Sequence, residues 1–408
     1  MPKVIIIGGG ASGLMAAAQS AKNGNETVIV EKMPRCARKV LISGKGRCNL
    51  TNATFDLEEL ISFVPKNPRF LYSAFSAFMP YDTIAFFEDL GVPTKIERGN
   101  RVFPVSDKAV DVVDALVKNA KSAGVKIIQG TVKAFEFDGN TISAVVLDDG
   151  SRLECSSVAV CTGGKSYPAT GSTGDGYILA RQAGHTVTEI QPSLVPLVCS
   201  NNFIPKLQGL SLRNVGVKLF QNEKLIYEDF GEMLFTHFGV SGPVILSASS
   251  HIRNFKNGAC SISIDLKPAL DFQALDKRIL RDFSEESNKD FINSLGKLLP
   301  KKLIPVIVSL SGIAPSKKVN EITREERRKL VDLIKNFRLG VSSFYDIDAA
   351  IVTSGGVDVK EIEPKTMKSK IISNLFFAGE VIDVDAYTGG FNLQIAFSTG
   401  YLCGNNMF

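Results

Sequence analysis

Three glycines and one acid near the start of the chain have the spacing of a dinucleotide site. Gly8, Gly10 and Gly13 fit the pattern G-x-G-x-x-G, and Glu31 follows Gly13 by 18 residues. The first glycine permits a tight turn, the second lets a pyrophosphate approach the backbone, and the third lets a helix pack against a strand. The Glu31 carboxylate can accept hydrogen bonds from both hydroxyls of an adenosine ribose and would repel a 2′-phosphate.

The elements that must position these residues are indicated by the surrounding pattern. Residues 4–7 read as a buried strand, 11–22 as an amphipathic helix, and 27–30 as a second strand that ends at Glu31. The free N–H groups at the helix start would face the phosphates, and the helix dipole favours their charge. Because strand, helix, second strand and acid are all in register, a dinucleotide site is favoured over an ordinary glycine-rich turn.

The segment 33–52 that follows is rich in cations, glycine and small hydroxyl residues, and it lacks the apolar period of a helix. We expect it to fold over the dinucleotide, with cations offsetting phosphate charge and glycines allowing close backbone approach. The alternative is a solvated basic loop. Cys48 has no partner cysteine nearby, so a packing or hydrogen-bonding role is favoured over redox chemistry. The cations concerned are Arg35, Arg38, Lys39, Lys45 and Arg47, and the glycines are Gly44 and Gly46.

The overall composition excludes several classes of protein. The chain has 408 residues, 44% hydrophobic and 22% charged, and a formal charge of +5 that makes no case for a nucleic-acid partner. No apolar run reaches the roughly 20 residues of a membrane span. Seven cysteines without a C-x-x-C pair indicate reduced thiols in the cytoplasm, and three histidines make a metal centre improbable. The bulk properties predict a cytoplasmic globular protein without a metal site or a membrane span.

The run S-G-K-G-R-C-N-L-T-N at Ser43–Asn52, after an N-terminal GGGASGL, carries a family resemblance. The chain resembles the bacterial NAD(P)/FAD-dependent oxidoreductases of the aminoacetone oxidase family, which also contains a bile-acid-pathway flavin reductase. The resemblance implies an extended FAD held by a two-part fold of the glutathione-reductase type. It also implies that the backbone of Val132 meets the adenine, and that Thr162-Gly163-Gly164 is a second flavin motif where the chain passes back under the dinucleotide.

The motif at the C-terminal end, Gly379-Glu380 followed by Asp383 and then Gly390-Phe391-Asn392-Leu393, completes the expected cofactor site. In two-part FAD folds such an acid sits at the ribityl chain, where Asp383 can accept a hydroxyl proton. The next helix then begins at the isoalloxazine. Its N–H groups can face flavin N1 and O2, and its dipole stabilises negative charge on reduced flavin.

Between these parts the pattern changes. Short alternating runs and prolines after residue 190 predict a β-rich insert, and helical patterns follow from about residue 268. The expected fold is α/β, with a discontinuous FAD-binding Rossmann-like domain (1–190 and 346–408), a β-rich subdomain (191–267) and a helical subdomain (268–345). The insert carries the family motif G-E-x-L-F-T-H-x-G-x-S-G-P, whose His237 is a candidate proton donor or acceptor. A structural hydrogen-bonding role is the alternative.

Three functional interpretations remain. The first is NAD(P)H-dependent reduction, through flavin N5, of a C=C bond conjugated to a carbonyl in a small organic substrate. The second is an oxidase that takes hydride from a small amine such as aminoacetone and produces peroxide. The third is a flavin-binding redox sensor without turnover. No second G-x-G-x-x-G occurs, so NAD(P)H would bind transiently at the flavin face, and the oligomeric state stays open.

The candidate residues fall into two groups. His237 and Arg47 are the candidates for catalysis. Those expected to bind FAD are Gly8, Gly10, Ala11, Ser12, Gly13, Glu31, Lys32, Arg38, Lys39, Ser43, Gly44, Gly46, Arg47, Cys48, Asn49, Val132, Thr162, Gly163, Gly164, Gly379, Glu380, Asp383, Gly390, Phe391, Asn392 and Leu393.

Overall fold

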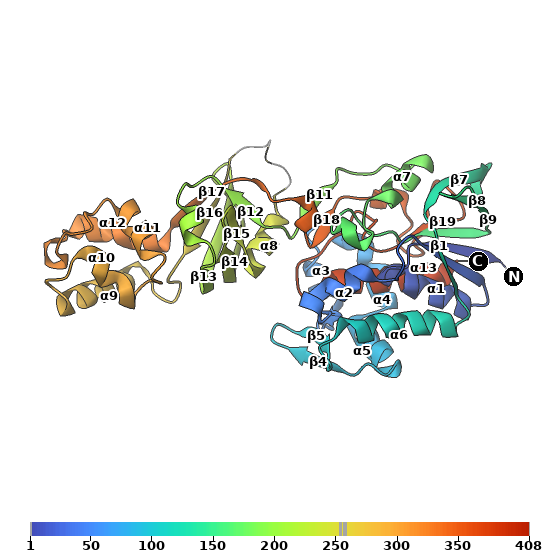
Figure 1. Cartoon of the computed structure of the whole chain (residues 1–408), viewed down its shortest axis with the longest axis horizontal. Coiled ribbons are helices and arrows are strands. Elements are labelled where there is room, and N and C mark those ends of the chain that lie inside the picture. Colours follow the sequence, from blue (N-terminus) through green and yellow to red (C-terminus); the bar gives the residue numbers. More distant parts are fainter. Residues whose placement is uncertain (1, 253–254, 256–258, 408) are drawn as a thin grey trace. The chain divides into compact units, whose positions relative to one another are not determined.

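The structure is a computed structural model that describes residues 2–252, 255 and 259–407. The chain forms two compact units (Figure 1). The first unit joins Met1–Ser193 to Asp346–Phe408, and the second is Leu194–Tyr345.

A five-stranded parallel sheet forms the core of the first unit, in the order β19-β10-β1-β2-β6. Its strands are nearly continuous apolar runs, as expected of a parallel sheet that is buried on both faces. The edge strand β19 comes from the C-terminal segment. Because the second unit precedes this segment in the sequence, the sheet can be completed only after the second unit has been synthesised. The strands are β1 (Lys3–Ile7), β2 (Glu26–Glu31), β6 (Lys126–Gln129), β10 (Ser157–Val160) and β19 (Leu375–Phe377).

Helices α1 (Ala11–Lys22) and α13 (Phe391–Asn406) pack against each other closely. Glycines on α13 make this approach possible. A Cβ added at Gly400 would lie 2.5 Å from the Ser12 carbonyl oxygen, and one at Gly404 would lie 2.3 Å from that of Ala16. The two chain ends are thereby joined through their helices.

Smaller elements surround this core. Three further sheets have the orders β7-β8-β9, β3-β5-β4 and β11-β18. Their strands are β3 (Thr51–Asn52), β4 (Thr94–Glu97), β5 (Arg101–Pro104), β7 (Val132–Asp138), β8 (Thr141–Leu147), β9 (Arg152–Glu154), β11 (Gln191–Ser193) and β18 (Val352–Ser354). The remaining α-helices are α2 (Arg38–Ile42), α3 (Leu57–Ser62), α4 (Tyr72–Ala77), α5 (Pro80–Asp89), α6 (Ala109–Ser122) and α7 (Asp175–Gln182).

The second unit contains a closed barrel in the order β12-β15-β14-β13-β16-β17. Side chains such as Val217, Phe235 and Ile262 are fully buried in its core. The strands are β12 (Leu197–Cys199), β13 (Ser211–Gln221), β14 (Lys224–Phe235), β15 (Gly239–Ser241), β16 (Cys260–Asp265) and β17 (Phe337–Phe344).

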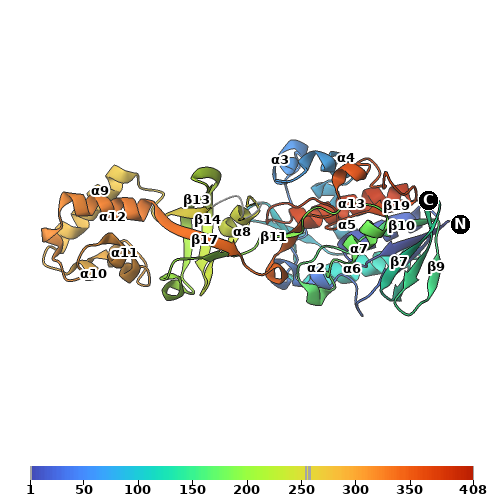
Figure 2. The same cartoon turned by 90° about the horizontal axis from the view of Figure 1, so that it is seen from above.

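Helices of the second unit gather beside the barrel in both views (Figures 1 and 2). A capping box begins α12, since the Glu326 N–H donates to Thr323 Oγ1 at 3.2 Å and the Thr323 N–H to Glu326 Oε2 at 2.8 Å. The helices are α8 (Pro243–Ser249), α9 (Phe272–Glu285), α10 (Phe291–Ser294), α11 (Ile304–Ser311) and α12 (Arg324–Lys335).

The α/β fold class is confirmed, and the local predictions differ from the structure at two places in the insert. The segment 337–344, which lay inside the predicted helical subdomain, is the barrel strand β17. Phe337, Leu339 and Val341 alternate with more exposed residues there, which is the period of a strand. Residues 289–299, also inside the predicted helical subdomain, form only the short helix α10 and a 3₁₀ turn.

Candidate functional site

A cavity opens at the carboxyl ends of the parallel strands. Its wall follows β1 at Gly8, β2 at Glu31, β10 at Thr162 and β19 at Glu380, which is where open α/β sheets bind ligands. The cavity and the open solvent at its mouth together have a volume of about 1080 Å³. Of the predicted cofactor residues, those that line it are Gly8, Gly10, Ala11, Ser12, Glu31, Arg38, Lys39, Ser43, Thr162, Gly163, Glu380, Asn392 and Leu393.

The glycine turn has the geometry that its spacing predicted. Gly8 has φ +99°, and a Cβ there would lie 2.6 Å from the Cys161 carbonyl oxygen. Gly13 lies behind the turn rather than on the cavity wall, and a Cβ there would lie 1.9 Å from the Gly8 carbonyl oxygen. The third glycine therefore serves the packing of α1 on β1.

Glu31 is fixed by the backbone around it. Its Oε2 accepts from the Gly9 N–H and its Oε1 from the Met33 N–H, both at 2.7 Å. Each carboxylate oxygen has further acceptor capacity. Because Glu31 lines the cavity at the end of β2, it can accept ribose hydroxyls as predicted.

A second, smaller cavity shares Gly8, Glu31, Thr162 and Gly171 with the first. Val132 lines it, and so does Lys32, whose Nζ lies 2.5 Å from Asp175 Oδ2. The shared residues place this cavity next to the ribose position, where an adenine is expected.

At the other end of the larger cavity lies the first turn of α13. Asn392 and Leu393 line the wall there, whereas Gly390 and Phe391 do not. The Asn392 side chain is held by the preceding loop, since its Oδ1 accepts from the Ala386 N–H at 2.9 Å and its Nδ2 donates to the Ala386 carbonyl at 2.7 Å. This side chain therefore fixes the approach to the helix start.

Lys39 and Glu380 form an ion pair in the cavity wall. Lys39 Nζ lies 2.8 Å from Glu380 Oε2 and donates to Ser166 Oγ at 2.7 Å. Glu380 Oε1 also accepts from the Thr353 N–H at 2.9 Å. Gly164 stands beside this network rather than in the wall, because a Cβ there would lie 2.8 Å from Glu380 Oε1. The expected phosphate partner Lys39 is thus already neutralised by an acid.

The acid of the C-terminal motif that faces the cavity is Glu380, and Asp383 is turned elsewhere. Asp383 is 3% exposed, and its Oδ1 lies 2.6 Å from Lys66 Nζ. Asp383 therefore does not face the cavity as predicted, and Glu380 is the acid of this motif that lines the wall. The neighbour that does line the wall is Val384, since adjacent residues of an extended segment point to opposite sides.

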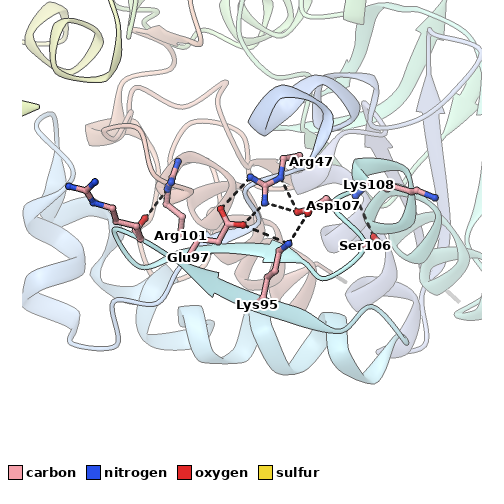
Figure 3. Close-up of polar contacts among 8 residues, drawn as sticks. Arg47, Lys95, Glu97, Arg101, Ser106, Asp107 and Lys108 are labelled. Atoms are coloured by element: carbon pink, nitrogen blue, oxygen red, sulfur yellow. Dashed lines mark hydrogen bonds and ion pairs between the residues drawn. The ribbon is translucent and has the colours of Figure 1, made fainter. Parts of the chain in front are cut away.

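Arg47 lies outside the cavity wall, with its guanidinium bound to two acids (Figure 3). Its Nε donates to Asp107 Oδ1 at 2.9 Å, it pairs with Glu97, and its Cζ stands 4.1 Å from the centre of the Phe103 ring. The hydrogen bonds that Arg47 donates to Glu97 and Asp107 raise the pKa of Arg47 above its already high value. Arg47 therefore does not reach the cavity as a candidate for catalysis and instead holds the loop on β4 and β5.

The rest of that loop supports the cavity from behind. Cys48 is fully buried, and burial raises its thiol pKa to about 12, so it behaves as a packing residue. Ser43 alone of the segment 43–49 reaches the wall. Five further residues that were predicted to bind the cofactor line neither cavity. Four belong to this loop, Gly44, Gly46, Cys48 and Asn49, and the fifth is Gly379 of the C-terminal motif.

His237 belongs to the second unit, between β14 and β15. Its side chain is exposed, and its ring meets the Phe238 ring edge to face with centres 5.0 Å apart. Its proton-transfer role stays a prediction.

Several wall residues were missed by sequence reasoning. They are Ala37, Val40, Cys161, Thr170, Gly171, Ser172, Ile351, Val352, Val384, Ile395 and Ala396, whereas Arg35 lines the wall as one of the cations expected there. Thr170, Gly171 and Ser172 form one loop of the wall. Ile351 precedes the short strand β18 and Val352 begins it, and these apolar residues gave no chemical signal.

These residues fit an extended FAD. Thr162 lines both cavities, and its Oγ1 is buried without a hydrogen-bond partner among the described residues. Such a group is costly unless a ligand satisfies it. One ligand spanning both cavities would place its ribose at Glu31 and its far end at the start of α13.

The sheet, the glycine turn and the cavity define a Rossmann-type dinucleotide-binding domain of the kind found in FAD-dependent oxidoreductases. The chain belongs to the family described as HI0933-like protein Rossmann domain, which matches residues 2–406. The 3-dehydro-bile acid delta(4,6)-reductase of Clostridium scindens is 32% identical, covering 99% of this chain and 98% of that protein. The resemblance to a family with a bile-acid-pathway reductase is confirmed, and the part concerning aminoacetone oxidase stays a prediction.

The chain is also similar to a second named protein and to a solved structure. A ribosomal RNA dihydrouridine synthase of Haemophilus influenzae is 32% identical, covering 98% of this chain and 96% of that protein. The solved 3-ketosteroid delta1-dehydrogenase of Sterolibacterium denitrificans has a TM-score of 0.52 at 13% identity, covering 99% of both chains. This last similarity shows a shared fold. Among the described residues, no helix combines the length and the apolar character needed to cross a bilayer.

Proposed function

We propose that this FAD-dependent oxidoreductase uses NAD(P)H to reduce a C=C bond conjugated to a carbonyl. The observation that carries the proposal is the cavity that runs from Glu31 to the start of α13 in a chain similar over its whole length to a named reductase. When bound, FAD supplies hydride transfer at flavin N5. The substrate must then lie beside the α13 end of the cavity.

The chain's own residues bind and orient the cofactor. The turn at Gly8 and Gly10 brings N–H groups to the pyrophosphate, and Glu31 holds the ribose. The start of α13 favours negative charge at the flavin end through its dipole. No second glycine motif provides an NAD(P) domain, so NAD(P)H is proposed to bind transiently at the flavin face.

The names of the two relatives point to one kind of reaction. A 3-dehydro bile acid with delta(4,6) unsaturation has C=C bonds conjugated to its 3-oxo group. Dihydrouridine forms when the C5=C6 bond of uridine, conjugated to the C4 carbonyl, is saturated. We therefore propose an alkene conjugated to a carbonyl as the substrate class, with a small organic molecule as the first candidate.

Uridine within RNA is the second candidate, because charge is unevenly distributed between the units. The second unit has 22 Lys and Arg against 15 Asp and Glu, whereas the first has 25 against 27. A surplus of seven positive charges on the insert favours a polyanion there, although the whole chain carries only +5. The expectation that the protein has no nucleic-acid partner was drawn from the total charge alone. Because the charge is unevenly distributed, that expectation stays open.

The test is anaerobic reduction of the purified protein, followed by the flavin absorbance. NADH or NADPH should bleach the flavin, and the colour should return on adding either a 3-oxo-4,6-diene steroid or a uridine-containing ribosomal RNA. Bleaching by aminoacetone and return of colour in air with peroxide would instead support the oxidase. Protein that cannot take up FAD would refute the cofactor assignment, and a flavin that is reduced but passes its electrons to none of these substrates would support the sensor.

We also propose that the protein works in the cytoplasm. All seven cysteines are free thiols, and five of them are more than nine-tenths buried, which fits a reducing compartment. The five are Cys36, Cys48, Cys161, Cys260 and Cys403.

A further inference from the structure

The hairpin of β4 and β5 carries two arginines at its turn. Glu97 pairs with Arg101 across the hairpin, so the turn between them holds only Arg98, Gly99 and Asn100. Gly99 and Asn100 both have positive φ, +76° and +58°. The Arg101 Nε donates to the Arg98 carbonyl oxygen at 3.0 Å, so the Arg101 side chain is held against the turn. This short turn keeps the two arginines close together.

The turn is anchored to the flavin end of the cavity through β3. Asn52 of β3 pairs with Arg101 in the antiparallel register, so the two side chains lie on the same face of this small sheet. The Asn52 Nδ2 donates to the carbonyl oxygens of Gly99 and Gly389, each at 3.1 Å. Gly389 directly precedes Gly390, the residue that caps α13. One side chain therefore joins the arginine turn to the start of the helix that is expected to meet the flavin.

The same face of the sheet also meets a loop of the cavity wall. Phe103 lies two positions after Arg101 on β5 and therefore shares its face. A Cβ added at Gly44 would lie 3.2 Å from Phe103 Cε1, and the preceding residue, Ser43, lines the cavity. The Cζ atoms of Arg47 and Arg101 stand 4.1 and 5.7 Å from the centre of the Phe103 ring, and both guanidinium groups lie above the hairpin in Figure 3. The exposed Arg101 side chain thus lies at the rim of the cavity, between the Ser43 loop and the start of α13.

The two arginines of the turn are not balanced by acids. The carboxylates of Glu97 and Asp107 are bound by Arg47 and by the lysine of β4. Neither Arg98 nor Arg101 pairs with an acid among the described residues, and both are exposed. Apart from its Nε, the Arg101 guanidinium keeps its N–H donors available. A planar fork of such donors suits the oxygens of a phosphate.

A second dinucleotide at the flavin end would need cations of this kind. NAD(P)H carries a diphosphate, and no second glycine motif in the chain offers helix N–H groups to it. In the cavity wall, Lys39 is bound to Glu380 and Arg35 to Asp114. Arg38 also lines the cavity, where it can serve the diphosphate of FAD itself. The arginines of the turn can hold another diphosphate outside that cavity while a nicotinamide reaches the flavin end.

We propose that Arg101, together with Arg98, binds the diphosphate of NAD(P)H while the nicotinamide lies against the flavin. The proposal rests on the NAD(P)H-dependent reductase function proposed above, and it gives the transient co-substrate a docking place within the first unit. Arg101 supplies the planar fork of donors, and Arg98 adds a second positive charge. Because neither side chain contacts the hydride, the pair should change the affinity for NAD(P)H and leave the rate of hydride transfer in the bound complex unchanged.

The test follows the bleaching of the FAD-loaded protein by NADH and by NADPH in anaerobic stopped flow. In Arg101→Gln, the dissociation constants of both should rise about 10-fold or more, the effect of losing hydrogen bonds to a charged group. FAD content and the limiting rate of bleaching should stay within about twofold of wild type. Arg101→Lys should recover part of the affinity. Added salt should weaken NAD(P)H binding more in wild type than in Arg101→Gln.

Two probes separate the diphosphate from the hydride chemistry. 1-Benzyl-1,4-dihydronicotinamide, a hydride donor without phosphate, should bleach wild type and Arg101→Gln at the same rate. ADP-ribose, which has the diphosphate and no hydride to give, should bind the oxidised wild-type holoprotein in calorimetry and should bind Arg101→Gln about 10-fold more weakly. Arg181→Gln, at an exposed arginine of α7 on the side of β7, is the matched control and should behave like wild type with every probe.

Each contrary outcome points to one of the two proposals. Equal dissociation constants for NADH and NADPH in Arg101→Gln and wild type would overturn the diphosphate site while leaving the proposed function intact. A loss of affinity confined to NADPH would also overturn it, because Arg101 would then bind the 2′-phosphate. A wild-type flavin that the benzyl donor bleaches, but that neither NADH nor NADPH bleaches, would overturn the NAD(P)H-dependent function itself.

Discussion

Lys39 Nζ and Glu380 Oε2 lie 2.8 Å apart in the cavity wall, although 341 positions separate the two residues in the sequence. Lys39 belongs to α2 near the N-terminus, and Glu380 follows the C-terminal strand β19. The pair therefore ties together the two halves of the discontinuous dinucleotide domain at the place where the ligand is expected. Its two side chains are 25% and 20% exposed, so water screens their interaction only in part.

The first prediction concerns the coupling within this pair. Lys39→Met and Glu380→Gln should each weaken FAD binding, because each leaves an unbalanced charge in the cavity wall. The double variant should lose less binding free energy for FAD than the two single variants lose together, and the difference, the coupling free energy, should be about 1 kcal/mol. FAD dissociation constants from flavin fluorescence provide the measurement. The exposed pair Lys126 and Glu26 is the control and should show no coupling.

The second prediction concerns Glu31. Glu31→Ala should weaken FAD binding by about 10- to 100-fold, since hydrogen bonds to a charged group contribute about 1.5–3 kcal/mol. Glu31→Gln keeps the shape of the side chain and should lose less FAD affinity than Glu31→Ala. Glu26→Ala, at the other end of β2, should bind FAD like wild type. Equal FAD retention in Glu31→Ala and Glu26→Ala would remove Glu31 from the ribose role.

The parts of the site that were predictable from the sequence depend on local spacing. The glycine turn is a local structure, set by the spacing of about thirty residues. This spacing correctly predicted that Gly8, Gly10 and Glu31 lie at the cavity and that Gly13 packs α1 onto β1. The two-part fold was also predictable, because β10 and β19 are short apolar strands that each run into a glycine motif.

The parts of the site that were not predictable lie in loops, whose sequences lack the hydrophobic periodicity of helices and strands. The choice between Glu380 and Asp383 as the acid of the cavity is made by the path of the chain after β19, which no spacing rule describes. Lys39 was expected to meet phosphate, and its pairing with Glu380 is a contact between distant segments. Arg47 was misjudged for the same reason, since its partners Glu97 and Asp107 lie on and after the small β4–β5 hairpin.

The third prediction concerns the glycine that packs α1 onto β1. Gly13→Ala would bring a Cβ to 1.9 Å from the Gly8 carbonyl oxygen, so the backbone of the turn must move. We expect a loss of FAD binding together with a destabilisation above about 4 kcal/mol, the range of severe core defects. Chemical denaturation and flavin content measure the two effects. Gly296→Ala meets no atom within 4 Å and should change neither.

The fourth prediction concerns the pH dependence of stability through His185. Its Nε2 lies 2.7 Å from Ser369 Oγ and its Nδ1 lies 3.2 Å from Glu361 Oε2, and its side chain is fully buried. Burial lowers the pKa of His185, while the Glu361 carboxylate acts in the opposite direction with a smaller effect. The folded first unit therefore favours the neutral imidazole.

The sign of the effect follows from proton linkage. Below the unfolded pKa of about 6.5, the unfolded chain binds a proton at this position that the folded chain resists. The stability that His185 contributes should be complete above that pH and should fall as the pH drops toward the lower folded pKa. Urea unfolding of wild type and His185→Gln at pH 7.5 and pH 5.5 measures this. The difference between the two pH values should be smaller in the variant, whereas His237→Gln, at an exposed histidine, should keep the wild-type difference. A His185→Gln protein with the full wild-type loss at pH 5.5 would show that the acid sensitivity arises from other groups.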